Sequence, residues 1–111
     1  MHAAERALEE GVRLFNAGAH WEAHEAWEGA WREASGARRA LLHGLILTAA
    51  GWVQRGRDRE AGARTLYTRA LARLQGVGGR AHGVDVEQLR ADLEAWRGGS
   101  ALPPPVLAHT R

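Results

Sequence analysis

The chain has 111 residues, of which 25% are charged, and it contains no cysteine. This length is sufficient for one domain with a single hydrophobic core, and the lack of cysteine excludes disulfide bonds and thiolate metal ligands. The first residues are partly charged and do not form the apolar run of a signal peptide. The longest apolar stretch, residues 41–53, is too short to cross a bilayer. We therefore expect a soluble, cytoplasmic protein with no membrane partner.

The hydrophobic periodicity predicts an all-α fold, because helical spacing recurs throughout and alternating strand patterns are nearly absent. We expect a compact bundle of about five helices, built from two stacked αα-hairpins. The predicted helices span residues 3–17, 20–35, 38–54, 59–74 and 85–97. Gly18 is placed to end the first helix, and Asp85 to begin the fifth. The third helix is apolar nearly all round, as a central helix should be.

The predicted domain covers residues 1–97, and residues 98–111 form a separate C-terminal tail. This tail contains the run Pro103-Pro104-Pro105. Consecutive prolines favour an extended polyproline II conformation. We expect this tail to dock on another part of the protein.

A loose internal repeat with an offset of 38 residues supports the two hairpins. This offset aligns a histidine and two glutamates of the first hairpin, His24, Glu25 and Glu28, with an apolar stripe of the second hairpin. The aligned residues of that stripe are Gly62, Ala63 and Leu66. Since we predict that the apolar stripe faces inward, the repeat predicts partial burial of the charged cluster.

The charged cluster lies on one helical stripe between two indoles. Residues three and four apart share a face of a helix, and such spacings connect Trp21, His24, Glu25, Glu28 and Trp31. Buried carboxylates are costly unless they are paired or hydrogen-bonded. The cluster can meet this demand in three ways, and the sequence leaves all three open. It can bind a divalent metal, pair with arginines, or share protons as a general acid–base pair.

In the metal hypothesis, His24 and Glu28 are ligands one turn apart, and Glu25 is a third ligand or a base. The pattern differs from the zinc-protease motif H-E-x-x-H, because Glu28 stands where that motif has its second histidine. Either His20 or His43 could complete such a site. In the pairing hypothesis, the candidate partners of the carboxylates are Arg39, Arg55 and Arg69.

The order of these residues resembles a known bacterial and archaeal family, domain of unknown function 309. The resemblance rests on Phe15-Asn16-x-Gly18-x-x-Trp21-x-Ala23-His24-Glu25-x-x-Glu28-x-x-Trp31-Arg32, on Leu42-His43-Gly44-Leu45-Ile46, on Arg55-Gly56 and on Gly62-Ala63-x-x-Leu66. It covers about residues 4–94 and implies a compact all-α fold of helical hairpins, with no assigned activity. The resemblance also implies that the signature residues form a site without a known ligand. These signature residues are His24, Glu25, Glu28, Trp31 and Arg32.

The chain departs from the family pattern at His43, where glutamine is common, and at Arg57, where asparagine is common. The first difference could add a ligand to the cluster, and the second argues against a role for that turn. The turn-and-aromatic pattern is also similar to a tetratricopeptide unit, over a shorter stretch.

Charge is distributed unevenly along the chain, and all 15 basic residues are arginine. Residues 1–33 contain seven acidic residues and three arginines, whereas residues 34–80 contain nine arginines and two acidic residues. An arginine-rich segment can attract an anionic partner, although a solvated helix face explains these arginines equally well. Nucleic-acid binding through the segment requires its arginines to share one face. The candidates are Arg38, Arg39, Arg55, Arg57, Arg59 and Arg64.

From these patterns we expect a binding or interaction module whose polar cluster forms a small groove. The candidate residues are Trp21, His24, Glu25, Glu28, Trp31, Arg32 and His43. The alternative is a metal-dependent or acid–base enzyme that uses His24, Glu25 and Glu28. Nucleic-acid association is a second alternative. A homodimer is a further hypothesis, because the apolar third helix suggests more burial than one small bundle needs.

Overall fold

The computed structural model describes residues 3–99, which form five helices and one short β-hairpin. The helices are α1 (Ala3–Asn16), α2 (His20–Glu33), α3 (Gly36–Gly56), α4 (Glu60–Leu74) and α5 (Val86–Arg97). The strands β1 (Arg80–Ala81) and β2 (Val84–Asp85) lie between α4 and α5. The prediction of an all-α protein with about five helices is therefore confirmed. The predicted polyproline run lies outside the described residues.

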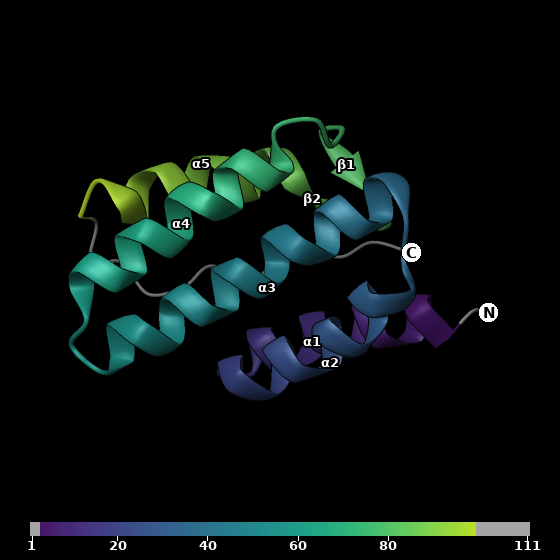
Figure 1. The fold of residues 1–111 in the computed structure, drawn as a ribbon, viewed down its shortest axis with the longest axis horizontal. Helices are drawn as coiled ribbons and strands as arrows, with labels where there is room; N and C mark the ends of the chain where they lie inside the picture. The colour runs from purple at the N-terminus through teal and green to yellow at the C-terminus, as the bar shows by residue number, and fades with distance from the viewer. Residues whose placement is uncertain (1–2, 100–111) are drawn as a thin grey trace.

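The helices pack in sequence-adjacent pairs: α1 contacts α2, α2 contacts α3, α3 contacts α4, and α4 contacts α5. Figure 1 shows the result: α3 runs through the middle, the α1–α2 hairpin covers one side of it, and α4 and α5 lie on the other. None of the helices within residues 3–99 is long and apolar enough to cross a lipid bilayer.

Local signals in the sequence set several of the helix ends. Gly18, just after α1, has a φ of 87°, a left-handed conformation that glycine adopts without steric cost. At the start of α5, the Asp85 side chain accepts a hydrogen bond of 3.0 Å from the backbone N–H of Gln88. This interaction is the helix cap that the sequence predicts at this position.

The β-hairpin was not predicted, because each strand has only two residues, too few for an alternating pattern. Arg80 pairs with Asp85 and Ala81 with Val84 in antiparallel register. The two turn residues, His82 and Gly83, both have positive φ, as a tight two-residue hairpin turn requires.

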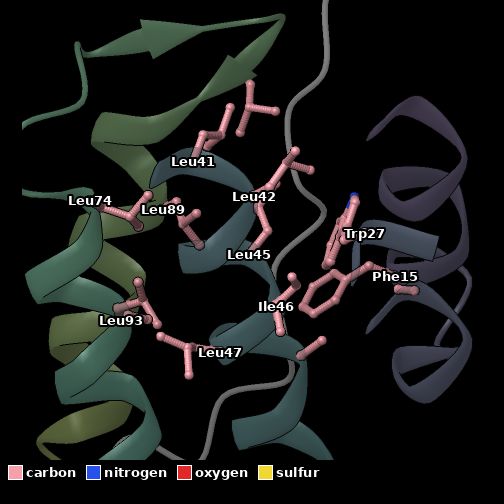
Figure 2. Packing of buried hydrophobic residues seen from close by; sticks show 14 of the residues in the cluster. Phe15, Trp27, Leu41, Leu42, Leu45, Ile46, Leu47, Leu74, Leu89 and Leu93 are labelled. Atoms are coloured by element: carbon pink, nitrogen blue, oxygen red, sulfur yellow. The ribbon is translucent and has the colours of Figure 1, made fainter. Parts of the chain in front are cut away.

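The hydrophobic core surrounds α3, in agreement with its apolar sequence. Figure 2 shows leucines and an isoleucine of α3 between Phe15 and Trp27 on one side and Leu74, Leu89 and Leu93 on the other. Each of these residues is at most 8% exposed. The central helix therefore joins the two halves of the protein by burying side chains in both directions.

Both hairpins use the same packing contact between their two helices. In α1, Gly11 lies against the Trp27 ring of α2, and a Cβ at this glycine would overlap the ring. In α3, Gly51 lies against the Tyr67 ring of α4 in the same manner. The equivalent residues are 40 positions apart in both helices of the pair. The two contacts are thus related by an offset of 40 residues, whereas the sequence predicted a repeat at an offset of 38.

Candidate functional site

The charged stripe of α2 faces solvent, because the opposite face of this helix is buried. The buried residues of α2 are Ala23, Trp27 and Ala30. In contrast, Glu25 is exposed, and Trp21 is 52% exposed, an unusual value for a large hydrophobic side chain. The expectation that the charged cluster is partly buried is therefore wrong for Glu25, whereas His24 and Glu28 are partly buried.

The side chains of this stripe contact one another in order along the helix. The His24 imidazole stacks on the Trp21 indole, with ring centroids 5.1 Å apart and planes 8° from parallel. His24 Nε2 lies 3.6 Å from Glu28 Oε2, and Arg32 Nη2 donates a hydrogen bond of 3.0 Å to Glu28 Oε1. The Glu28 carboxylate therefore lies between the His24 imidazole and the Arg32 guanidinium. Glu25 has no ion-pair partner within the described residues.

These side chains line an open pocket of about 340 Å³ on the surface of α2. The lining residues are Trp21, His24, Glu25, Glu28, Gly29 and Arg32. Apart from the neighbouring backbone of α2, no atom lies within 4 Å of the position that a Cβ at Gly29 would take. Gly29 was not predicted as a member of this site. The signal that could have identified it is a helix-interior glycine, which destabilises a helix relative to alanine.

Trp31 and His43, which the sequence assigned to the same cluster, lie together at a different place, between α2 and α3. Their ring centroids are 5.3 Å apart. The Arg39 guanidinium covers the Trp31 ring at 4.1 Å from its centroid and donates a 2.8 Å hydrogen bond to the Trp31 carbonyl. The structure therefore divides the predicted cluster into the α2 pocket and the Trp31–His43 pair.

Positive charge surrounds His43. Burial lowers the pKa of His43, and the nearby arginines Arg73, Arg69 and Arg39 lower it further by electrostatic repulsion of the protonated ring. His43 therefore lies against Trp31 and near arginines of α3 and α4, and it is not among the residues that line the α2 pocket.

The described residues do not fit a metal site of the predicted kind. Within residues 3–99, no three histidine or acidic side chains converge in a way that could hold a metal ion. His20, the other predicted ligand, contacts Phe15 at 4.7 Å and Trp52 at 6.1 Å between ring centroids instead. His24 and Glu28 thus remain an isolated pair, whereas a catalytic zinc uses three protein ligands.

The arginines predicted to pair with the carboxylates of α2 do not form ion pairs with them in the described structure. Arg39 covers Trp31, and Arg55 lies 3.4 Å from Glu60. The six arginines proposed for nucleic-acid binding are divided in the same way, since Arg38 also has an internal partner, Glu5, at 3.2 Å. The later members of that set, Arg57, Arg59 and Arg64, are exposed in the turn before α4 and on α4 itself.

The fold and the site together define a small all-α protein with an open surface pocket on its second helix. A family model described as "Domain of unknown function (DUF309)" matches residues 8–66, from α1 into α4. The chain therefore belongs to this family, as the resemblance in the sequence suggested, and the α2 pocket lies within the matched region.

The chain is also similar to the crystal structure of a conserved hypothetical protein, TTHA0068, from the bacterium Thermus thermophilus. The sequences are 35% identical, and the TM-score is 0.72. The match covers 82% of this chain and 95% of the other. No curated protein matches the chain.

Proposed function

We propose that this protein is a binding module and that its α2 pocket docks a basic segment of a protein partner. The observation that supports this function most directly is an exposed indole beside a carboxylate without a cationic partner. Trp21 provides the indole and Glu25 the carboxylate, on the same side of one helix.

The two groups suit one kind of side chain. An arginine or lysine placed over the Trp21 ring gains a cation–π interaction, and the same group can donate a charge-assisted hydrogen bond to the Glu25 carboxylate. Tryptophan is also enriched among the residues that dominate protein–protein binding energy. Glu28 adds negative potential at the pocket, partly neutralised by Arg32.

Acid–base catalysis receives less support from this geometry. The pocket is lined by one helix only and is open to water, whereas catalytic groups usually converge from several elements in a site that excludes water. Glu28 is already engaged with His24 and Arg32. The binding function needs neither a shielded site nor a free acid–base pair.

The test is calorimetric titration of the full chain with a capped peptide of alternating arginine and glycine. We expect saturable binding that weakens about tenfold in Trp21→Ala, which removes the ring and leaves the charge unchanged; this corresponds to about 1.4 kcal/mol. We expect a similar loss in Glu25→Gln. The matched control is Glu33→Gln, which removes the same charge from α2 outside the pocket.

The comparison between Glu25→Gln and Glu33→Gln distinguishes a specific binding site from general electrostatic attraction. If Glu33→Gln weakens binding as much as Glu25→Gln, and Trp21→Ala has no effect, the peptide responds only to net charge and the proposed function is wrong.

A further inference from the structure

A row of aromatic rings joins the two hairpins at the end of the protein where α1 and α3 finish. In order along the row the rings are Phe15, His20, Trp52 and Trp96, with successive centroids 4.7, 6.1 and 4.9 Å apart. They belong to α1, α2, α3 and α5. Phe15 and Trp96 are buried, whereas the two central rings, His20 and Trp52, are partly exposed. We call this surface the aromatic row.

The two central rings carry nitrogen atoms that lack a hydrogen-bond partner. His20 Nε2 and Trp52 Nε1 are both shielded from water, and neither has a partner in the described structure. An indole N–H can only donate a hydrogen bond, and an imidazole nitrogen that carries the proton donates as well. Buried donors are nearly always satisfied in native proteins. The aromatic row therefore calls for a segment that supplies acceptors.

The described helices are not arranged to supply these acceptors. Figure 1 shows α1 beside α2 and α5 beside α4, on the two sides of α3. Within residues 3–99, neither α1 nor α5 packs closely on α3. The carbonyls inside each helix are already bonded to N–H groups of the same helix. An acceptor for the aromatic row must therefore come from another part of the chain or from another molecule.

The C-terminal segment, residues 100–111, has the complementary chemistry. It contains all three prolines of the chain, Pro103, Pro104 and Pro105, and residues 101–108 include no charged or hydrogen-bonding side chain. Proline has no backbone N–H, and a polyproline II segment makes no internal hydrogen bonds. Its carbonyls are therefore available as acceptors, and its apolar side chains gain from contact with aromatic rings.

This segment also begins beside the aromatic row. At the end of α5, the Gly99 backbone N–H donates a hydrogen bond of 3.0 Å to the carbonyl of Trp96, whose ring meets the Trp52 ring edge-on. Each residue of a polyproline II segment adds about 3.1 Å, so that the proline run extends to roughly 12–19 Å from Gly99. Since the neighbouring rings are 4.9 and 6.1 Å apart, Trp52 and His20 lie within this reach.

We propose that the aromatic row is a polyproline-binding surface and that residues 100–111 of the same chain occupy it. Trp52 Nε1 and His20 Nε2 donate hydrogen bonds to carbonyls of the proline run, and the proline rings pack on the aromatic rings. Aromatic surfaces recognise Pro-rich segments in this way, because the polyproline II conformation is already formed before binding. The covalent connection at Gly99 keeps the prolines at a high effective concentration beside the row. This connection favours the chain's own segment over one from another molecule.

The docked segment connects the α1–α2 hairpin to α5, two parts of the protein that are far apart in the sequence. The aromatic row shares no residue with the lining of the α2 pocket. The proposed binding of a basic segment in that pocket and the docking of the C-terminal segment are therefore tested independently.

The test is hydrogen exchange of the Trp52 indole N–H, followed by two-dimensional NMR of the ¹⁵N-labelled full chain. We expect exchange at least tenfold faster in the triple variant Pro103→Gly, Pro104→Gly, Pro105→Gly, which removes the proline rings and their fixed backbone angle. Its helix content in circular dichroism should match that of the wild type, because the substitutions lie outside α1–α5. The matched control is His109→Gly, beyond the apolar run, which should leave the exchange rate unchanged.

A synthetic peptide of residues 100–111 examines the same contact between separate molecules. It should bind the triple variant saturably and slow the exchange of the Trp52 indole again. It should bind the wild type at least tenfold more weakly, because the row is already occupied there. Equal binding to both proteins would show that the wild-type row is open and would contradict the proposal.

Three results of the exchange experiment would also overturn the proposal. Equal rates in the wild type and the triple variant would show that the helices alone protect the indole. An effect of His109→Gly as large as that of the triple variant would show that the row does not recognise the prolines. Protection that falls on dilution, together with a dimer in sedimentation, would show that the segment of a second copy occupies the row.

Discussion

At the scale of single residues, Gly29 connects the stability of α2 with the proposed binding function. Glycine in a helix interior is destabilising relative to alanine by about 1 kcal/mol. The packing of the described structure gives no reason for glycine here, since no atom lies within 4 Å of a Cβ at this position. Gly29 lines the α2 pocket, and an alanine methyl at this position would add bulk to that lining.

We therefore expect Gly29→Ala to raise the free energy of unfolding by about 0.5–1 kcal/mol and to weaken the binding of the arginine peptide. Urea unfolding and calorimetry measure the two effects on the same sample. Stabilisation with unchanged binding would contradict the role of Gly29 in the pocket.

A second prediction at this scale concerns pH. Burial lowers the pKa of His20, which contacts Phe15 and Trp52. Since the folded state disfavours the protonated ring, the stabilisation is present above the ordinary pKa of about 6.5 and is lost as the pH falls through the lower folded value. Stability should decrease from pH 7.5 to pH 5, and His20→Phe should reduce that slope by at most one proton. An unchanged slope in this variant would show that His20 is not the titrating group.

At the scale of the elements, the equivalent glycines of α1 and α3 explain how each hairpin closes. A side chain at Gly11 would overlap the Trp27 ring, and one at Gly51 would overlap the Tyr67 ring. The buried Trp27 ring is further fixed by a hydrogen bond of 3.1 Å from its Nε1 to the Leu8 carbonyl. Aromatic rings therefore take the space that the glycines leave free.

We expect Gly11→Ala and Gly51→Ala each to lower the free energy of unfolding by about 1–3 kcal/mol, as overpacking of a core does. Gly29→Ala, at an open position of α2, is the matched control and has the opposite expected sign. Chemical denaturation of the three variants measures the difference. If all three shift stability in the same direction, helix propensity and not ring packing determines the outcome.

The helices could be predicted from the sequence, and the buried face of α2 also has a local signal. Helix ends carry signals such as Gly18 and Asp85, which a reader of the sequence can recognise. The buried residues of α2, Ala23, Trp27 and Ala30, follow helical spacing, but the repeat at an offset of 38 residues placed the charged cluster on an inward face instead. An error of two residues in the offset rotates a helix by about 200°, which exchanges the inward face for the outward one. This rotation explains why the cluster was predicted to be buried.

The separation of Trp31 and His43 from the pocket has a related cause. Trp31 lies near the end of α2, and its position is determined by tertiary contacts with Arg39 and His43 of α3. Helical spacing places residues on a stripe but does not reveal which neighbouring helix covers part of that stripe.

At the scale of the whole molecule, the two hairpins present surfaces of opposite charge on opposite sides of α3. Within the described structure the α2 pocket contains Glu25, an acidic residue without an ion-pair partner, whereas an open groove beside α4 is lined by Arg64 and Arg69.

The central claim is that the α2 pocket binds a basic segment through Trp21. The most direct test is two-dimensional NMR of the ¹⁵N-labelled protein during a titration with the arginine–glycine peptide. The account predicts saturable shifts of the Trp21 indole N–H, identified with Trp21→Phe, and of the Gly29 amide. The amides of Gly62 and Thr65 on α4 should not move. Shifts confined to α4, or no shift of the Trp21 indole at a peptide concentration that saturates the calorimetric signal, would contradict it.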